Sequence, residues 1–415
     1  MILKNAKCLI GKDLVKKDIE IIDGIITKIS DKIDADGLDL KGLTILPSFI
    51  DPHVHLREPG FEYKSTILEG SKSCAKGGYT DVFMMPNLNP TPSSKESIKP
   101  LLEAKKTGVI RCHILGSITK NEASIELSDF DDIDEYCLGY SDDGKGVKTS
   151  KLMYEAMLKV KKLNKHIIAH VEDESLLYGG CIKKGKFSEE NNLKGILGIS
   201  ETAQLARDLV LAKETQVKYH MCHMSTKNSL ELMNFYKDKA NVTCEVCPHH
   251  LLLCENDLVD SGDFKMNPPL AGYDDMMALR EALKKGQIDC IATDHAPHSN
   301  EEKSRGLEKS AFGIVGIEDA FSLMYTNFVL TNDISLYDLI CMMSLNPSRI
   351  FNLDSHEIKV GNKANLTIVD LDGKYTISKD RLISRATSMP FSGYEVNGII
   401  KYTIMDGQIV FEKLQ

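Results

Sequence analysis

The sequence lacks several features that would place the protein at a membrane or on a nucleic acid. It has no apolar run close to the roughly 20 residues that a membrane-spanning helix needs. Its first residues, MILKNAKCLIGKDLVKKD, contain no apolar segment followed by a small-residue cleavage site, so we expect no signal peptide and a cytoplasmic location. Basic residues are not in excess, because the net charge is −9, and this argues against a nucleic-acid partner.

A second C-x-x-C pair is also missing. Cys244 and Cys247 have this spacing, but a structural zinc site of that type needs two such pairs. The 11 cysteines are odd in number, and without an export signal they are typical of buried free thiols in a reducing cytosol. We therefore expect Cys244 and Cys247 to be two thiols on a strand.

Both ends of the chain carry the same short pattern. Asp23-Gly24, Asp372-Gly373 and Asp406-Gly407 each stand between β-rich runs, and Asp-Gly in this position is a strong hairpin signal. The chain has 415 residues, 42% of them hydrophobic, which suits one large barrel with an addition. We predict a small β-sandwich domain built from residues 1–46 and 357–415.

The middle of the chain, residues 47–356, alternates between β-rich runs and helical patterns. Apolar residues recur at three- and four-residue spacing in segments such as 150–163, 201–214, 228–238 and 274–286, as in amphipathic helices. The β-rich runs are 44–56, 80–87, 111–119, 137–144, 166–173, 218–226, 241–250 and 289–298. This alternation predicts an α/β fold with a closed (β/α)8 TIM barrel. A doubly wound open sheet is the alternative, but no G-x-G-x-x-G follows the first run.

Polar residues of metal-binding types stand at the ends of five of these runs. Active sites of (β/α)8 barrels lie where the carboxyl ends of the strands meet. Strand residues at i and i+2 point the same way, so His53 and His55 can reach one cation. The residues at the run ends are His53, His55, Asp142, Asp143, His170, His223, Asp294 and His298. Imidazoles and carboxylates together suit zinc, and two zinc ions could activate a shared water as a nucleophile.

Each of these residues also has an ordinary structural interpretation. A single histidine after an apolar run, such as His170 or His223, is often a core or capping residue. Asp142-Asp143-Gly144 also fits a plain turn. His113 and the pair His249-His250 lie on other runs and are kept as structural or supporting residues. The convergence of several independent run ends on one rim is what favours a metal centre.

A series of motifs occurs in one order from about Leu46 to the end of the chain. They are DPHVHLREPG, MMPNLNP, SDDGKGV, AHVEDESLLYGG, CHMST, VCPHHLLL, KMNPPL, ATDHAPH and AFGIVGIE. This series resembles the class I bacterial dihydroorotases of the amidohydrolase superfamily. The resemblance implies a zinc-dependent enzyme of pyrimidine biosynthesis that interconverts N-carbamoyl-L-aspartate and (S)-dihydroorotate.

The resemblance also implies a set of metal ligands. His53, His55 and Asp294 correspond to the ligands of the more buried zinc, and His170 and His223 to those of the second. In much of this superfamily a carboxylated lysine bridges the metals. Asp143 is the residue here that fits the variant with a bridging aspartate, which leaves one or two zinc ions per subunit open. Lys145 is a less favoured bridge.

Substrate and catalytic residues follow from the same resemblance. Arg57 offers a rigid fork for the substrate carboxylate, with Asn87 and His298 as partners. Asn267 and the backbone around Phe312 and Gly313 would hold the ring amides. Asp294 would take a proton from the attacking water and pass it to the departing ring nitrogen. The charged segment 299–313 is either a solvated loop or a lid over the substrate.

Several related functions remain open. Allantoinases, hydantoinases and dihydropyrimidinases cut similar cyclic amides on the same scaffold. Hydantoinase and dihydropyrimidinase substrates lack the free carboxylate, so Arg57 and Asn87 argue against these two. An inactive homologue that serves as a structural partner of aspartate carbamoyltransferase is a further alternative, but every candidate ligand is present. We expect a homodimer, with association with aspartate carbamoyltransferase as an additional possibility.

Overall fold

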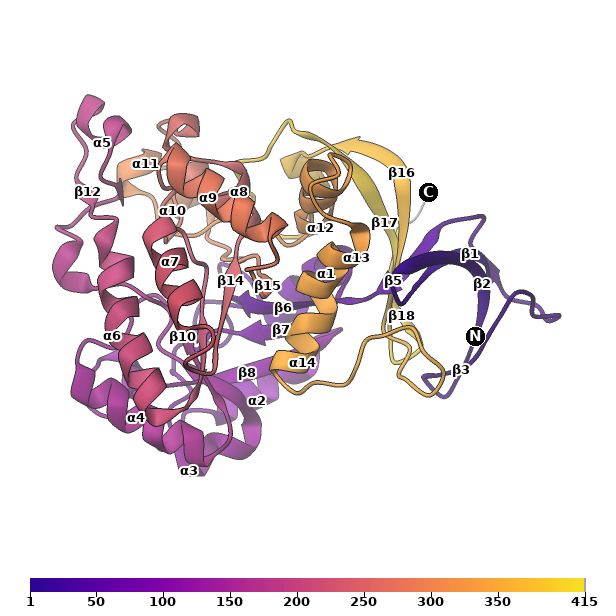
Figure 1. Ribbon diagram of the computed structural model, residues 1–415, viewed down its shortest axis with the longest axis horizontal. Helices are drawn as coiled ribbons and strands as arrows, with labels where there is room; N and C mark the ends of the chain where they lie inside the picture. The colour runs from indigo at the N-terminus through magenta and orange to yellow at the C-terminus, as the bar shows by residue number, and fades with distance from the viewer. Residues whose placement is uncertain (414–415) are drawn as a thin grey trace.

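The computed structural model describes residues 1–413 and shows a barrel with a separate sheet at one side (Figure 1). Within these residues, eight parallel strands pair in the order β15-β14-β13-β10-β9-β8-β7-β6. A parallel bridge between Val54 and His295 joins the first strand to the segment after the last, and His55 N–H donates to His295 O at 2.9 Å. The predicted (β/α)8 barrel is therefore confirmed.

The barrel strands follow the predicted β-rich runs. They are β6 (Phe49–Val54), β7 (Tyr79–Met84), β8 (Arg111–Ser117), β9 (Cys137–Ser141), β10 (His166–Ala169), β13 (Lys218–Met221), β14 (Val242–Val246) and β15 (Cys290–Ile291). All six residues of β6 and of β7 are buried, as expected for parallel strands covered on both faces. A short parallel pair, β11 (Ile182–Lys183) and β12 (Gly195–Ile196), projects beyond β10.

Helices connect the strands and pack around them, most of them on the outside of the barrel (Figure 1). They are α1 (Ile67–Lys76), α2 (Lys99–Ala104), α3 (Phe130–Ile133), α4 (Ser150–Lys162), α5 (Lys186–Glu190), α6 (Ile199–Thr215), α7 (Lys227–Tyr236), α8 (Pro248–Leu252), α9 (Tyr273–Lys284), α10 (Asn300–Lys303), α11 (Gly306–Lys309), α12 (Ala320–Met324), α13 (Leu336–Ile340) and α14 (Asn346–Ile350). The four predicted helices are α4, α6, α7 and α9. In α4, Met153, Ala156, Met157 and Val160 face the core, and the Thr149 side chain caps the first turn by accepting from Leu152 N–H.

The two ends of the chain form the second sheet together. In the described part of the chain its strands are β1 (Ile2–Ile10), β2 (Asp13–Ile22), β3 (Ile25–Ser30), β4 (Leu38–Asp39), β5 (Thr44–Pro47), β16 (Leu366–Thr376), β17 (Glu395–Met405) and β18 (Gln408–Glu412). The strands share a core that includes Leu3, Ile19, Ile26, Leu366 and Ile404. Figure 1 shows both termini on this side of the molecule. The predicted small β domain from both termini is thus present.

Two of the three Asp-Gly hairpins are confirmed and one is wrong. Asp23-Gly24 joins β2 to β3, and Asp406-Gly407 joins β17 to β18. Asp372-Gly373 instead lies inside β16, which continues along the same partner strand past a bulge. Gly373 N–H donates to the carboxylate of Asp370 at 3.0 Å, so the extra residues are absorbed locally.

The predicted run 44–56 contains two strands. β5 pairs with β1 and β16 in the terminal sheet, and β6 starts the barrel one residue later. Hydrogen-bond partners on each side of Ser48 therefore decide where one sheet ends and the other begins. The predicted domain boundaries, residues 1–46 plus 357–415 for the β domain and residues 47–356 for the barrel, remain a prediction. The boundary after residue 46 lies close to this change of sheet.

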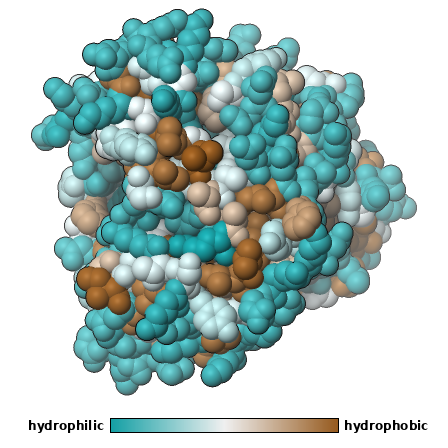
Figure 2. All heavy atoms as spheres, turned by 60° about the vertical axis from the view of Figure 1, so that its left-hand side comes forward, coloured by the Kyte–Doolittle hydropathy of each residue, from teal (hydrophilic) through white to brown (hydrophobic). Residues whose placement is uncertain are grey.

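The hydrophilic surface and the buried free thiols agree with what the composition predicts. The face shown in Figure 2 is covered mainly by hydrophilic side chains, with hydrophobic residues in small separated groups. Among residues 1–413, no helix is long and apolar enough to cross a membrane. All 11 cysteines are free, and ten of them are buried. Cys244 lies on β14 as expected, whereas Cys247 follows the strand and precedes α8.

Candidate active site

The carboxyl ends of the barrel strands bring the predicted metal-binding residues together. His53 lies in β6 and His55 directly after it, Asp143 follows β9, and His170 follows β10. His223 and Asp294 follow β13 and β15. All six are buried.

Asp143 lies at the centre of the four histidines. Its Oδ1 atom is 3.3 Å from His53 Nε2, 3.6 Å from His170 Nδ1 and 3.7 Å from His223 Nε2. Its Oδ2 atom is 3.4 Å from His55 Nε2. His170 Nδ1 and His223 Nε2 are themselves only 3.1 Å apart. One carboxylate is therefore shared by two groups of histidines, His53 with His55 and His170 with His223.

Asp294 lies beside the first of these groups. Its Oδ1 atom is 3.1 Å from His55 Nε2 and 3.4 Å from His53 Nε2. Burial alone would raise the pKa of Asp294, but the charge of His53 and the hydrogen bond with His55 hold that pKa well below its ordinary value. Asp294 and His223 have φ angles of 49° and 31°, unusual for residues other than glycine. Backbone strain of this kind is typical of functional sites.

The cluster fits a bound metal ion. Two of its buried atoms, His53 Nε2 and Asp143 Oδ1, have no hydrogen-bond partner in the described structure. Burial lowers the pKa of His53, yet the charges of Asp143 and Asp294 raise it overall well above its ordinary value. The cluster thus attracts positive charge at a place where water is excluded. A cation that accepts lone pairs from imidazole and carboxylate would satisfy these atoms.

Glu245 supports this cluster and was not predicted from the sequence. Its Oε1 atom accepts from His53 Nδ1 at 2.8 Å and from His223 N–H at 3.2 Å, and its Oε2 atom lies 3.0 Å from His220 Nε2. The carboxylate is fully buried in β14. With the proton of His53 on Nδ1, the lone pair of Nε2 faces the cluster. A charged residue within the apolar run 241–247 was the available signal, because a buried carboxylate needs partners.

The contacts of Asp143 differ from those of its sequence neighbours Asp142 and Lys145. Asp142 accepts from Ile118 N–H at 2.8 Å and from Thr119 N–H at 2.9 Å, so it faces away from the histidines and fixes a neighbouring loop. Lys145 is half-exposed, with Nζ 3.9 Å from Glu122 Oε2. Asp143 is therefore the residue of this turn that lies among the four histidines.

A cavity of about 250 Å³ opens beside the cluster. Every residue predicted from the resemblance to bind substrate lines it, together with four of the six predicted ligands. The lining residues are His55, Arg57, Asn87, Asp143, Gly144, His170, Asn267, Asp294, Ala296, His298, Phe312 and Gly313. This volume suits a small molecule of about ten heavy atoms, below the usual range for drug-sized ligands.

One end of the cavity is positively charged. Arg57 Nε donates to Pro297 O at 3.0 Å, and Nη2 lies 3.1 Å from His298 Nε2. Burial and the charges of Arg57 and Lys64 lower the pKa of His298 to about 2, so its ring is neutral. Lys64 lies 3.1 Å from Glu302, which also caps the first turn of α10 through Ser299. Arg57 is thus held in place with its remaining N–H groups available to an anion.

Two asparagines connect the cavity to the histidines. Asn87 Oδ1 lies 2.9 Å from His55 Nδ1, an arrangement in which the ring donates and the amide NH₂ of Asn87 is left for a ligand. Asn267 Nδ2 donates to Glu172 Oε2 at 3.3 Å, and the same oxygen is 3.5 Å from His170 Nε2. Glu172, which the sequence did not single out, therefore holds both an amide of the cavity and a histidine of the cluster.

The segment 299–313 is folded against the cavity. It contains α10 and α11, and Ser310 N–H and Ala311 N–H donate to Gly306 O and Glu302 O. Phe312 and Gly313, at its end, line the cavity. This placement favours the lid interpretation over that of a solvated loop.

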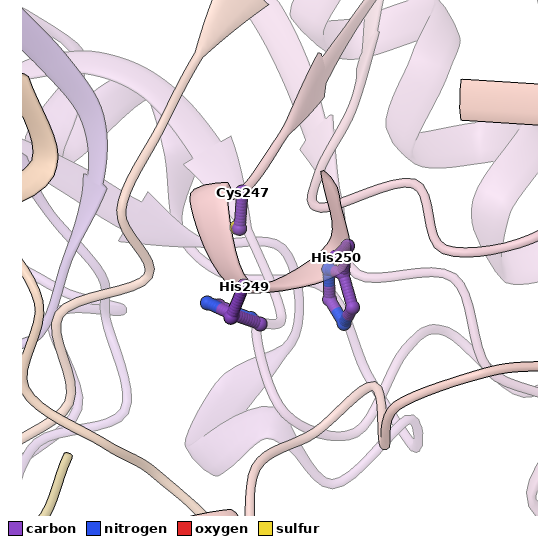
Figure 3. Close-up of side chains that lie close together, drawn as sticks. All are labelled: Cys247, His249 and His250. Atoms are coloured by element: carbon purple, nitrogen blue, oxygen red, sulfur yellow. The ribbon is translucent and has the colours of Figure 1, made fainter. Parts of the chain in front are cut away.

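Cys247, His249 and His250 form another group of potential metal ligands, each with one atom within 4.8 Å of the others. All three come from α8 or the residue before it (Figure 3). Burial lowers the pKa of His250 to about 4, so its ring is neutral, and its Nε2–H donates to Pro268 O at 2.9 Å. This contact supports the segment that carries Asn267, which agrees with the supporting role expected for the pair.

Comparisons with known proteins agree on one family. Residues 42–229 match the family model described as dihydro-orotase-like. The chain is 45% identical to a dihydroorotase of Fusobacterium nucleatum over 417 residues, which cover 99% of this chain and 98% of the relative. It is 43% identical to a dihydroorotase of Staphylococcus aureus over 419 residues, 99% of each chain.

Solved structures extend the likeness of fold. An L-hydantoinase (dihydropyrimidinase) from Arthrobacter aurescens superposes with a TM-score of 0.87 at 22% identity, over 100% of this chain and 96% of that one. A dihydropyrimidinase from Brevibacillus agri gives 0.86 at 21% identity, over 99% and 95%. At these identities the structures establish the shared fold alone. The full-length similarity to the curated relatives establishes more: the chain belongs to the dihydroorotase family of amidohydrolases.

Proposed function

We propose that this protein is a zinc-dependent dihydroorotase that interconverts N-carbamoyl-L-aspartate with (S)-dihydroorotate and water, in the cytoplasmic synthesis of pyrimidines. One observation carries the proposal. A single cavity has a metal-binding cluster on one wall and the Arg57 guanidinium on another. A cyclic amide with a carboxylate on its ring needs both: a Lewis acid at the amide and a fixed cation for the anion.

The spacing of the cluster supports zinc as the metal. Two ligands that are each about 2.1 Å from a tetrahedral zinc ion lie about 3.4 Å apart. The contacts among His53, His55, Asp143 and Asp294 are 3.1 to 3.4 Å. On this basis these four residues would hold one zinc.

Asp143 also belongs to the group that it forms with His170 and His223. The three contacts within this group are 3.1 to 3.7 Å. We therefore propose that these three residues would hold a second zinc, with Asp143 shared between the two positions in place of a carboxylated lysine. Metal analysis of the purified protein tests the count.

The positive end of the cavity would bind the substrate carboxylate. Arg57 keeps its charge at neutral pH, because burial lowers its pKa only to about 10. It would pair with the anion, and the NH₂ of Asn87 and the neutral ring of His298 would add hydrogen bonds. The ring amides would then face Asn267 and the backbone at Phe312 and Gly313. This orientation places the scissile amide toward Asp294.

Asp294 would move the proton in the reaction. When bound, zinc supplies Lewis acidity at the amide carbonyl and lowers the pKa of water toward neutrality. Asp294 is ionised, so it accepts a proton from the attacking water as the C–O bond forms. As the ring C–N bond breaks, Asp294 returns the proton to the nitrogen. The second proton of the water leaves to solvent as the new carboxyl group ionises, so the products are a carboxylate and a ureido NH₂ group, and ring closure in biosynthesis is the reverse.

A coupled assay of ring opening and closing, with zinc removed and restored, tests the proposal. Dihydroorotate, allantoin and dihydrouracil are compared side by side. The carboxylate site predicts turnover of dihydroorotate and little of dihydrouracil, whereas a hydantoinase-like enzyme would prefer the substrate without a carboxylate.

The quaternary assembly is tested separately. Light scattering with and without aspartate carbamoyltransferase tests the expected homodimer and any complex. A folded, metal-free chain that converts none of the three substrates would indicate an inactive structural partner.

A further inference from the structure

Lys303 is a buried lysine of α10 that no step of the proposed mechanism uses. Its side chain is 7% exposed. The ammonium Nζ donates to three backbone carbonyls, those of Lys265 at 2.9 Å, Ala311 at 2.8 Å and Gly313 at 2.6 Å. In its ammonium form a lysine has three N–H donors, so each has one acceptor, and burial lowers the pKa of Lys303 only to about 7.

The three carbonyls belong to two different walls of the cavity. Lys265 lies two residues before Asn267, and Ala311 and Gly313 lie on either side of Phe312. Asn267, Phe312 and Gly313 all line the cavity. Gly313 N–H also donates to Lys265 O at 3.0 Å, so the two walls meet where Nζ binds. One ammonium thus ties together the segments proposed to contact the substrate ring.

The partners of Lys303 are neutral carbonyls. Among the described residues, no carboxylate oxygen lies within 4.0 Å of its Nζ, whereas its neighbour Glu302 pairs with Lys64 at 3.1 Å. Burying an ammonium is costly unless its hydrogen bonds are made. A lysine on the surface would not have this cost, because water would solvate its ammonium group. The geometry indicates that Nζ is held here for the carbonyls it binds.

We propose that Lys303 is a positioning residue that fixes the ring-binding walls of the cavity, at Asn267 and at Phe312-Gly313. Through them it sets the affinity for the cyclic substrate. The inference rests on the proposed function for its kinetic consequence, but the clamp between the two walls is a property of the fold. The same turn of α10 therefore supports both ends of the cavity, with Glu302 at the carboxylate end and Lys303 at the ring end.

Kinetics of Lys303→Met test the role in substrate binding, with Lys162→Met, an exposed lysine of α4, as the matched control. When a substitution removes contacts that are equally strong in the ground state and the transition state, KM rises and kcat stays unchanged. We expect KM for dihydroorotate to rise about tenfold or more, with kcat within about threefold, and no change in the control. A fall in kcat per total protein with KM unchanged would show a merely structural residue and overturn the proposal.

Hydrogen exchange tests the clamp without relying on activity. The Gly313 amide should exchange at least several-fold faster in Lys303→Met than in the wild type or in Lys162→Met. Equal exchange overturns the clamp. If the wild type does not convert dihydroorotate, the proposed function fails, while the exchange result still decides the clamp. Should Lys303→Met not fold, Lys303→Gln, with a shorter side chain and two N–H donors, is measured by the same criteria.

Discussion

Glu245→Gln should weaken zinc binding while it leaves the fold nearly intact. Glutamine keeps the shape of glutamate, so its carbonyl can still accept from His53 Nδ1–H. Its NH₂ group then faces His220 Nε2, 3.0 Å away in the wild type. His220 can adapt by moving its proton to Nδ1, because Thr243 Oγ1, at 2.8 Å, can accept it. The substitution therefore removes the negative charge behind His53, and one N–H of the new amide pairs with His220 Nε2.

The expected size of the effect follows from that lost charge. Removing a carboxylate that orients a metal-binding histidine costs about 10- to 100-fold in metal affinity, or about 1.4 to 2.8 kcal/mol. At equal free zinc, the zinc-dependent part of the unfolding free energy should fall by up to about 2.7 kcal/mol. The unfolding free energy of the metal-free protein should change by no more than about 1 to 3 kcal/mol, the cost of one buried N–H of the new amide that lacks an acceptor.

Competition with a chromophoric zinc chelator measures the affinity, and denaturant unfolding with and without zinc measures the two stabilities. Glu231→Gln, on the exposed side of α7, is the matched control and should match the wild type in both. A folded Glu245→Gln protein with zinc affinity within about twofold of the wild type would refute the role assigned to Glu245.

Three further predictions address other groups. Asp294→Asn should lower kcat by about 10² to 10⁴-fold with little change in dihydroorotate binding, measured by turnover and by equilibrium binding, and near-normal turnover would remove Asp294 from its role. Arg57→Met should raise KM for dihydroorotate about 10- to 150-fold but leave any activity on dihydrouracil unchanged; equal losses on both substrates would contradict carboxylate binding. Burial raises the pKa of Asp208 from 3.8 to about 6, so its contribution to stability is present below pH 4 and is lost as pH rises through 6. The stability of the wild type relative to Asp208→Asn should therefore fall by about 2 kcal/mol between pH 4 and 7 in urea unfolding, and a pH-independent difference would count against this.

The fold was largely predictable because the chain repeats one local pattern. Each barrel strand is a short apolar run, and each covering helix has apolar residues on one face. The prediction failed where strand pairing decides whether a segment turns or continues as a strand. Asp372-Gly373 has the local signature of a hairpin, yet β16 continues through it because β17 pairs with β16 on both sides of the bulge.

The proposed ligands were visible in the sequence for a related reason. Polar residues such as His170 and His223 directly follow apolar runs, and parallel strands bring their carboxyl ends to one rim. Their supporting residues were not visible in this way. Glu245 lies inside a strand and Lys303 inside a charged segment, and neither position indicates which residue the side chain contacts.

The sequence by itself determined the alternating elements, the barrel and the residue types that meet at its rim, because periodicity and strand order are local or follow from topology. Only the tertiary structure decided which of two adjacent aspartates lies among the histidines. It also decided that Glu245 faces His53 Nδ1 and so holds the proton of His53 on that atom, and that Lys303 joins two walls of the cavity. These facts depend on contacts between residues far apart in the chain, such as His53 and Glu245, 192 residues apart, and Lys265 and Lys303, 38 residues apart, and no local pattern encodes such distances.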